Sequence, residues 1–185
     1  NLSAWYNAHT QLIVNIYLAG MMLLLFRIMY NLFTLKNIKR QGVTLPGNDW
    51  LQLLEKCATN MRIKQKVELL CSIKVTVPLV MGAMKPVILL PVALASQLST
   101  REAEAILLHE LAHIRRNDYL VNMIQLFIET LLFYNPFVWL ISSIIRKERE
   151  HCCDDAVVNA TRERLPYVKA LATLETFRQQ PVLPS

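Results

Sequence analysis

The sequence predicts an α+β chain that is mainly helical and anchored in a membrane. Three observations support this fold class. Residues 11–33 are almost continuously apolar, residues 66–91 hold short Val- and Ile-rich segments bounded by Gly and Pro, and long segments with helical periodicity follow from residue 99. A mean hydropathy of +0.29, with 54% hydrophobic residues, is also high for a soluble domain.

The first element is a membrane-spanning helix over residues 11–33, since about 20 apolar residues cross the hydrocarbon core of a bilayer. A buried core helix is the alternative. Aromatic anchors precede the helix and positive residues follow it: Trp5 and Tyr6, then Lys36, Lys39 and Arg40. Because Lys and Arg collect on the cytoplasmic side, we expect residues 1–35 to be an extracytoplasmic stub and a transmembrane helix. Residues 36–185 then face the cytoplasm.

The next elements are a linker, a helix and a small sheet. Residues 41–50 are rich in Gly and Pro, and Asn48 is a candidate cap for a helix that runs to about residue 60. Residues 66–82 and 83–91 predict two strands separated by Gly82. Pro78 marks an edge or a bulge, because proline cannot donate to a strand ladder.

A helix with a capping signal follows the sheet. Ser99 and Glu102 have the spacing of a capping box. Apolar residues then recur at helical spacing, namely Ala103, Ile106, Leu107, Leu111 and Ile114. This pattern places the segment HELAH, at residues 109–113, on a helix.

The apolar segment from residue 119 predicts a hydrophobic helical hairpin over residues 119–150. Pro136 breaks the helical pattern, and both flanks are positive, with Arg115 and Arg116 before and Arg146, Lys147 and Arg149 after. Two antiparallel helices, at about 119–133 and 137–153, return the chain to the same side. A single span is the alternative. A last amphipathic helix, at 163–178, offers a packing face of Leu165, Val168, Leu171, Ala172 and Leu174.

Composition limits the function classes. The net charge is +6, but the positive residues form no single tract and no nucleic-acid motif is present, so we expect no direct nucleic-acid partner. Cys152 and Cys153 are adjacent and no CxxC occurs, which favours reduced thiols in a cytoplasmic compartment. A first residue that is Asn and a polar ending, QQPVLPS, indicate a piece of a longer protein.

The segment HELAH has the spacing of a zinc hydrolase. His109 and His113 lie one helical turn apart and share a face, so two neutral imidazoles can bind one Zn²⁺ ion. Glu110, beside the first histidine, can reach a water molecule on the metal and act as catalytic base. Two ordinary histidines on an apolar helix are the alternative.

The third ligand is expected in residues 146–158, where acidic and metal-binding residue types cluster. Glu150 and Asp154 share a helix face; Glu150 can bind the metal, and Asp154 can accept a hydrogen bond from a ligating histidine. His151 and Cys153 are alternative ligands. Arg116 and Tyr119 exclude the metzincin pattern, which needs Gly and His there. A solvated charged helix remains the other interpretation.

The segments VTVPLVMGAMKPVILLP, LSTREAEAILLHELAHIRRNDYLVN, FYNPFVW and REHCCDDAVV occur in this order and spacing. Together they resemble the membrane-embedded gluzincin domain of beta-lactam sensor-transducer antirepressors of the penicillinase and methicillin-resistance type. A more distant similarity is to prenyl-protein endopeptidases. The resemblance implies a cytoplasm-facing zinc metallopeptidase with ligands His109, His113 and Glu150. It also implies Glu110 as catalytic base, and places Asp118 and Asp154 behind the ligands.

The resemblance implies signal-triggered cleavage of a cytoplasmic repressor, of the chain itself, or of both. Membrane lipid and a second copy of the chain are the other expected partners. Nothing after residue 158 resembles the SxxK motif of a penicillin-binding domain, so a beta-lactam signal is not implied. The alternatives are a constitutive membrane processing or quality-control metalloprotease and a non-catalytic zinc signalling module.

Two features of catalysis are also expected from the residues. An extended peptide can add as a strand to the sheet edge around residues 74–82. An oxyanion donor is required, and four side chains are candidates, although core packing is the alternative for each tyrosine: Tyr119, Tyr134, His151 and Tyr167.

Overall fold

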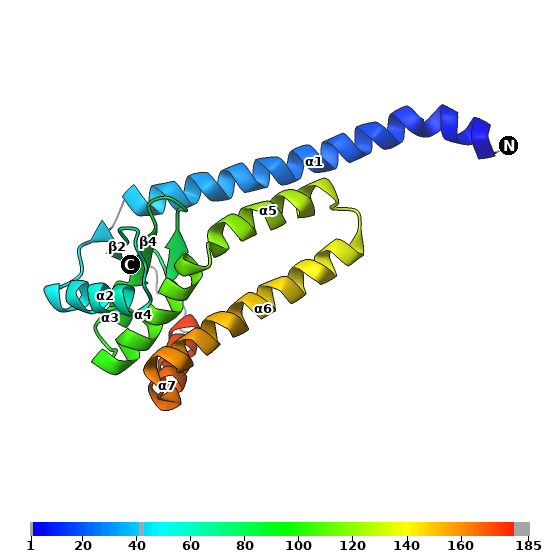
Figure 1. The fold of residues 1–185 in the computed structure, drawn as a ribbon. Helices are drawn as coiled ribbons and strands as arrows, with labels where there is room; N and C mark the ends of the chain where they lie inside the picture. The colour runs from blue at the N-terminus through cyan, green and yellow to red at the C-terminus, as the bar shows by residue number, and fades with distance from the viewer. Residues whose placement is uncertain (1, 41–42, 180–185) are drawn as a thin grey trace.

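The computed structural model describes residues 2–40 and 43–179 of the chain. The helices are α1 (Leu2–Arg40), α2 (Asn48–Asn60), α3 (Val92–Ala95), α4 (Thr100–Arg115), α5 (Asp118–Leu131), α6 (Pro136–Thr161) and α7 (Arg164–Gln179). The strands are β1 (Val43–Thr44), β2 (Glu68–Ser72), β3 (Leu79–Met81) and β4 (Val87–Pro91). The sheet and helices α2, α3, α4 and α7 gather at one end, and α1 and the pair α5–α6 extend from it (Figure 1). The predicted mainly helical α+β fold is confirmed.

The sheet has the strand order β1-β2-β4-β3. The central strands β2 and β4 run parallel, with Leu70 opposite Leu89, and both outer pairs are antiparallel. All of β4 is buried, which explains why its sequence, VILLP, is continuously apolar rather than alternating. In the strand order β3 is one of the two outer strands, so the sheet has the edge strand that the sequence predicts.

The prediction of one strand over residues 66–82 is wrong in its middle, because residues 73–78 form no strand. The backbone N–H of Lys74 donates to the Ser72 hydroxyl (3.1 Å), which turns the chain out of the ladder. Gly82 has φ +83°, and a Cβ there would lie 2.8 Å from the Lys85 carbonyl oxygen. Glycine is thus required at this turn.

Two expectations for residues 41–50 also need correction. Residues 41 and 42 lie outside the described residues, but Val43–Thr44 pairs with β2 as a short strand rather than a linker. The cap of α2 is Gly47, not Asn48, which is already the first helical residue. The Gly47 carbonyl accepts from the N–H of Trp50 (3.0 Å). Local sequence signals place the start of a helix only to within one or two residues. They do not show whether a segment will pair with a strand that lies far away in the sequence.

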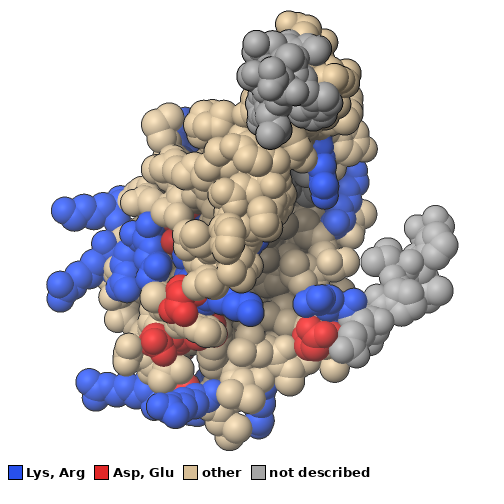
Figure 2. Space-filling model, turned by 90° about the vertical axis from the view of Figure 1, so that its right-hand side faces the viewer, with Lys and Arg blue, Asp and Glu red and all other residues tan. Residues whose placement is uncertain are grey.

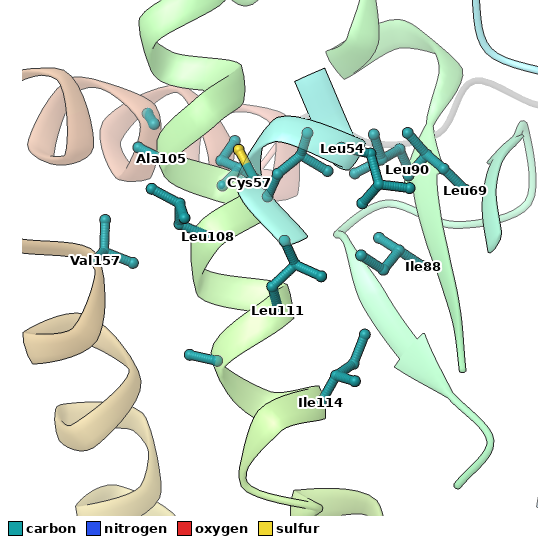
Figure 3. Packing of buried hydrophobic residues seen from close by; sticks show 14 of the residues in the cluster. Leu54, Cys57, Leu69, Ile88, Leu90, Ala105, Leu108, Leu111, Ile114 and Val157 are labelled. Carbon is teal, nitrogen blue, oxygen red and sulfur yellow. The ribbon is translucent and has the colours of Figure 1, made fainter. Parts of the chain in front are cut away.

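Helix α4 lies at the centre of the hydrophobic core (Figure 3). Leu107, Leu108 and Leu111 on this helix are at most 1% exposed. They pack between α2, the sheet and α6, which contribute Leu54 and Cys57, Leu69, Ile88 and Leu90, and Val157. Burial on several sides fixes the direction of α4, so the polar face that carries the histidines has a defined orientation.

Helix α4 begins at the predicted capping box. The Ser99 hydroxyl accepts from the N–H of Glu102 (3.4 Å), and the Glu102 carboxylate accepts from the N–H of Ser99 (2.9 Å). The Ser99 hydroxyl also donates to the Glu102 carboxylate (2.6 Å). This bond and the one from the Ser99 N–H lower the pKa of the Glu102 carboxyl.

Ser99→Ala is expected to lower the free energy of unfolding by about 1 kcal/mol, because the cap of α4 loses its side-chain acceptor. Since the pKa of Glu102 is lower in the folded state, the advantage of the native cap is present at neutral pH and shrinks as the pH falls through that pKa. Denaturant titration at two pH values measures both effects. Ser96→Ala, at an exposed serine outside the box, is the control and should change stability by less than about 0.5 kcal/mol.

Helices α5 and α6 form the antiparallel pair that the sequence predicts, joined at Asn135 and Pro136. The Asn135 side chain caps α6 by accepting from the N–H of Phe137 (3.0 Å), and Pro136 occupies the first helical turn. Helix α6 continues to Thr161, beyond the expected end at 153. It is therefore one uninterrupted helix from the apolar turn into the core.

Helix α1 lies beside α5 and meets the turn of the pair (Figure 1). The Tyr17 hydroxyl donates to the Leu131 carbonyl (2.8 Å), and a Cβ on Gly20 would lie 2.7 Å from the Phe133 ring. The absence of a side chain at Gly20 thus permits this close approach. The side chains of Trp5, Tyr6, Lys36, Lys39 and Arg40 lie outside the described part of the structure.

These extended helices expose a large apolar surface. Within α1, residues His9–Tyr30 are long and apolar enough to cross a membrane, with a mean hydropathy of 2.1 and 0% buried. Viewed from the end of the pair α5–α6, uncharged side chains fill the centre and Lys and Arg lie around the sides and below (Figure 2). The exposed apolar residues of the pair include Ile124, Phe127, Phe137, Leu140 and Ile141.

Helix α7 buries a face that shares only Leu174 with the predicted one. Leu165, Val168 and Leu171 are 42–64% exposed, whereas Tyr167 and Ala170 are at most 4% exposed and pack in the core with α4. The small Ala170 permits close approach of the two helices. Two apolar stripes run along α7, and its contact with α4 determines which one is buried.

Candidate metal centre

His109 and His113 project from one face of α4, opposite the leucines that anchor this helix in the core. Their side chains are 15% and 19% exposed, and their Nε2 atoms lie 3.2 Å apart. The ring planes are nearly perpendicular, at 82°. The i, i+4 spacing therefore directs two nitrogen ligands to one point, as expected from the sequence.

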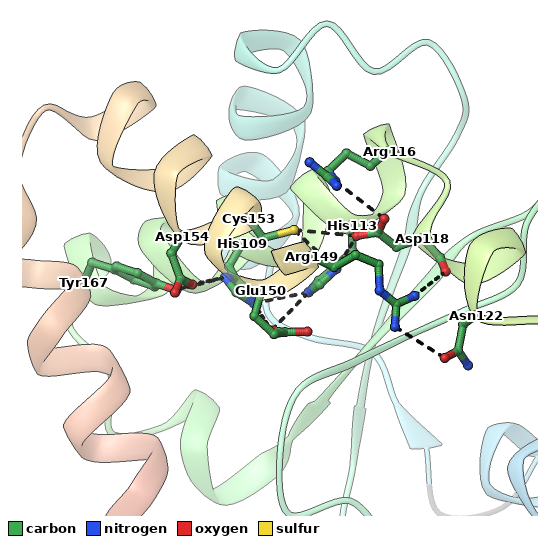
Figure 4. Close-up of polar contacts among 10 residues, drawn as sticks. All are labelled: His109, His113, Arg116, Asp118, Asn122, Arg149, Glu150, Cys153, Asp154 and Tyr167. Carbon is green, nitrogen blue, oxygen red and sulfur yellow. Dashed lines mark hydrogen bonds and ion pairs between the residues drawn. The ribbon is translucent and has the colours of Figure 1, made fainter. Parts of the chain in front are cut away.

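The structure brings Glu150 of α6 to the same point (Figure 4). Its Oε2 atom lies 3.6 Å from His109 Nε2 and 3.8 Å from His113 Nε2. A tetrahedral ion with metal–nitrogen bonds of about 2.1 Å has ligand atoms about 3.4 Å apart. The observed triangle of 3.2, 3.6 and 3.8 Å fits that size, and two nitrogens with one carboxylate oxygen suit zinc.

Each histidine has a hydrogen-bond partner on its other nitrogen. His113 Nδ1 lies 2.8 Å from Asp118 Oδ2, and Asp118 is 6% exposed. His109 Nδ1 lies 2.9 Å from the Tyr167 hydroxyl and 3.3 Å from Asp154 Oδ1. Asp118 and Asp154 thus lie on the sides of the two rings away from Glu150.

A tight turn between α4 and α5 places Asp118. Asn117 has a left-handed backbone with φ 57°, a conformation that asparagine tolerates better than most residues. Helix α5 begins at the next residue, so the Asp118 side chain in its first turn reaches back to His113. Arg116 also pairs with this carboxylate (3.5 Å).

Cys153 lies behind His113 rather than in the triangle. Its Sγ atom is 3.3 Å from His113 Nδ1 and 3.7 Å from Asp118 Oδ2. Burial, together with the Asp118 charge, raises the pKa of the Cys153 thiol to about 12, so the thiol stays protonated at neutral pH. The described residues hold two candidate metal-binding groups, His109 with His113 and Glu150, and His113 with Asp118 and Cys153. His151, the other alternative ligand, is exposed and belongs to neither group.

Glu110 lines a cleft of about 340 Å³ together with His109, His113 and Glu150. It is 8% exposed, and burial raises the pKa of its carboxyl against the opposing effect of the two imidazoles. Leu79 and Val80 of β3, and Gly82 just after it, also line this cleft. The cleft can therefore hold an extended chain between the Glu110 carboxylate and a strand edge.

The candidate oxyanion donors are separated by the fold. Tyr119 lines the cleft, whereas Tyr134 is at the distant turn of the pair α5–α6 and His151 points to solvent. Tyr167 contacts His109 on the side away from the cleft.

Arg149 was not anticipated as a cleft residue. It lines the cleft and donates to the Asp118 carbonyl (3.2 Å). The sequence offers no signal for this beyond its position next to Glu150.

Comparison with known proteins gives consistent matches. Residues 1–184 match the family described as BlaR1 peptidase M56. The chain is 30% identical over 150 residues to the "Regulatory protein BlaR1" of Bacillus licheniformis, covering 81% of this chain and 25% of that protein. It is 24% identical over 174 residues to the "Methicillin resistance mecR1 protein" of Staphylococcus aureus and of Staphylococcus epidermidis, covering 92% of this chain and 29% of theirs. The chain thus spans less than a third of these relatives.

Proposed function

This chain belongs to the BlaR1 peptidase M56 family, and from that premise we propose that it is a membrane-anchored zinc endopeptidase with its site facing the cytoplasm. The proposed substrate is a cytoplasmic protein, either a transcriptional repressor or the chain itself, cleaved after a signal. The names of its relatives, which refer to regulation and to methicillin resistance, support a regulatory role.

One observation carries the proposal. The possible ligand atoms of His109, His113 and Glu150 form a triangle of zinc-binding size, and Glu110 lines the same open cleft. A structural zinc site is closed by four protein ligands, whereas a catalytic site keeps a position open. Three ligands next to a buried carboxylate therefore favour hydrolysis over a non-catalytic zinc module.

The proposed roles follow from position. His109, His113 and Glu150 would hold the ion, which when bound supplies the Lewis acidity that activates water and polarises a peptide carbonyl. The Glu110 carboxylate takes a proton from the attacking water and passes it to the nitrogen of the peptide bond that breaks, which leaves as an amine. Asp118, bonded to Nδ1 of His113, holds the proton there and leaves Nε2 free.

The substrate is proposed to bind along β3. In the sheet order, β3 is the outer strand, and Leu79 and Val80 line the cleft. An extended peptide can add to such an edge through main-chain hydrogen bonds. This narrows the predicted docking segment from residues 74–82 to Leu79–Met81.

The apolar helices give the proposed membrane arrangement. Residues 9–30 of α1 would cross the bilayer, and the exposed apolar surface of α5 and α6 would contact lipid. The positive residues that flank the pair would then lie at the cytoplasmic surface: Arg115, Arg116, Arg146, Lys147 and Arg149. A second copy of the chain remains a proposed partner.

Metal removal tests the proposed activity. The purified chain in detergent is expected to contain about one zinc ion and to cleave peptides from a proteome digest, or itself, with products identified by mass spectrometry. Chelation with 1,10-phenanthroline should stop cleavage because Glu110 alone is a weak catalyst. One equivalent of Zn²⁺ should restore it and Mg²⁺ should not, since Mg²⁺ prefers oxygen ligands.

The other outcomes discriminate between functions. Cleavage that persists without metal would show that the activity does not depend on zinc. One bound zinc without cleavage of peptides or of the chain would instead indicate a zinc signalling module.

A further inference from the structure

The two histidines of the candidate centre are supported in different ways. His113 meets a buried carboxylate directly, with Asp118 Oδ2 at 2.8 Å from Nδ1. His109 meets a hydroxyl first, because Tyr167 Oη lies 2.9 Å from its Nδ1 and Asp154 Oδ1 lies farther away, at 3.3 Å. The Tyr167 hydroxyl in turn donates to Asp154 Oδ1 at 2.5 Å.

The protonation of His109 determines which atom donates in each of these hydrogen bonds. A histidine that binds a metal through Nε2 must carry its proton on Nδ1. That N–H of His109 can donate to an oxygen lone pair of Tyr167, whose own O–H is directed to Asp154. The opposite tautomer would require the Tyr167 O–H to turn from the carboxylate to Nδ1. Asp154 therefore favours the metal-binding tautomer through the hydroxyl.

Of the two residues hydrogen-bonded beyond His109 Nδ1, Tyr167 has the more fixed position because it is buried. Tyr167 is 4% exposed, whereas the Asp154 side chain is 41% exposed. The Tyr167 ring stacks beside the His109 ring, with centroids 6.0 Å apart and an interplanar angle of 29°. Ala170, one turn on, is fully buried in the same core. Docking of α7 on α4 thus determines where the hydroxyl lies.

We propose that Tyr167 is a positioning residue that holds His109 in its zinc-binding tautomer and orientation by passing the hydrogen bond from Nδ1 to Asp154. The inference rests on the proposed zinc site and adds to it a residue from α7. It also removes Tyr167 from the candidate oxyanion donors, since its hydroxyl contacts the nitrogen that faces away from the cleft (Figure 4).

Tyr167→Phe tests the inference, because it removes the hydroxyl and keeps the buried ring. The affinity of the full chain in detergent for Zn²⁺, measured by competition with a chromophoric chelator, is expected to fall about 10- to 100-fold. The absorption spectrum of the Co²⁺-substituted chain should also change. Tyr134→Phe makes the same chemical change at an exposed tyrosine of the α5–α6 turn and should leave affinity and spectrum as in the native chain.

A double variant tests the order of the contacts. If the hydrogen bond runs through Tyr167, Asp154→Asn should weaken zinc binding to a similar extent, and the double variant should lose little more than the more affected single variant. Losses that multiply in the double variant would overturn the inference, because the two residues would then act on His109 separately.

Folding and function are tested separately. The unfolding midpoint of the metal-free Tyr167→Phe chain should stay close to that of the native chain, so an affinity change reports the hydroxyl. Native affinity and native Co²⁺ spectrum in Tyr167→Phe, in a chain that binds zinc, would overturn this inference alone. A native chain that binds no zinc would overturn the proposed function itself.

Discussion

Glu110→Gln is expected to reduce peptide cleavage by about 10²- to 10⁴-fold while leaving about one zinc ion per chain. Glutamine has the shape of glutamate but cannot accept the proton of the attacking water. Glu110 is not part of the ligand triangle, so metal binding should persist. Cleavage rates on the proteome-digest peptides and metal content by mass spectrometry measure the two effects on the same sample.

Glu104→Gln is the matched control for this change. Glu104 lies on the same helix, but its carboxylate faces away from the cleft and pairs with Lys56 at 3.0 Å. This variant should keep both zinc and activity. Native cleavage by Glu110→Gln would show that another group serves as the base and would remove this residue from the mechanism.

Glu150→Ala is expected to weaken zinc binding by at least about 100-fold, because two imidazoles alone make an incomplete site. The effect should exceed that of Tyr167→Phe, since Glu150 would contact the ion itself. Zinc retained after dialysis against a weak chelator measures the loss, and cleavage should fall in proportion to the metal lost.

Glu148→Ala is the control for this second change. Glu148 is exposed, lies two residues earlier on α6 and belongs to neither candidate metal-binding group among the described residues. Its removal should leave zinc binding unchanged. If Glu150→Ala retained zinc and His151→Ala lost it, the third ligand would have been assigned to the wrong residue.

Local patterns predicted the parts of the structure that depend on neighbours in the sequence. The capping box at Ser99, the break at Pro136 and the shared face of His109 and His113 each follow from spacing within one or two helical turns. Glu150 was predicted from the acidic residues that cluster around it, although it lies 37 positions after His113 in the sequence. The fold then brings these two side chains within 3.8 Å.

Features set by distant contacts were not predictable in the same way. Helix α7 has two apolar stripes, and periodicity gave no reason to prefer the one that contains Tyr167. The contact of Tyr167 with His109 joins residues 58 positions apart and depends on that choice. Similarly, β1 forms because Thr44 pairs with Cys71 of β2 in an antiparallel ladder. No local sequence pattern indicates this pairing.

Helix α6 has a mechanical consequence. Its 26 residues make a helix about 39 Å long. Glu150 lies between the apolar end at Phe137 and the buried Val157. If Val157 acts as the fulcrum, Phe137 lies about 30 Å from it and Glu150 about 10 Å. A sideways displacement of about 3 Å at the apolar end then becomes about 1 Å at Glu150. Under the proposed mechanism, misplacement on that scale would cost about 100-fold in rate, so a small movement of the outer end of α6 would be enough to slow cleavage.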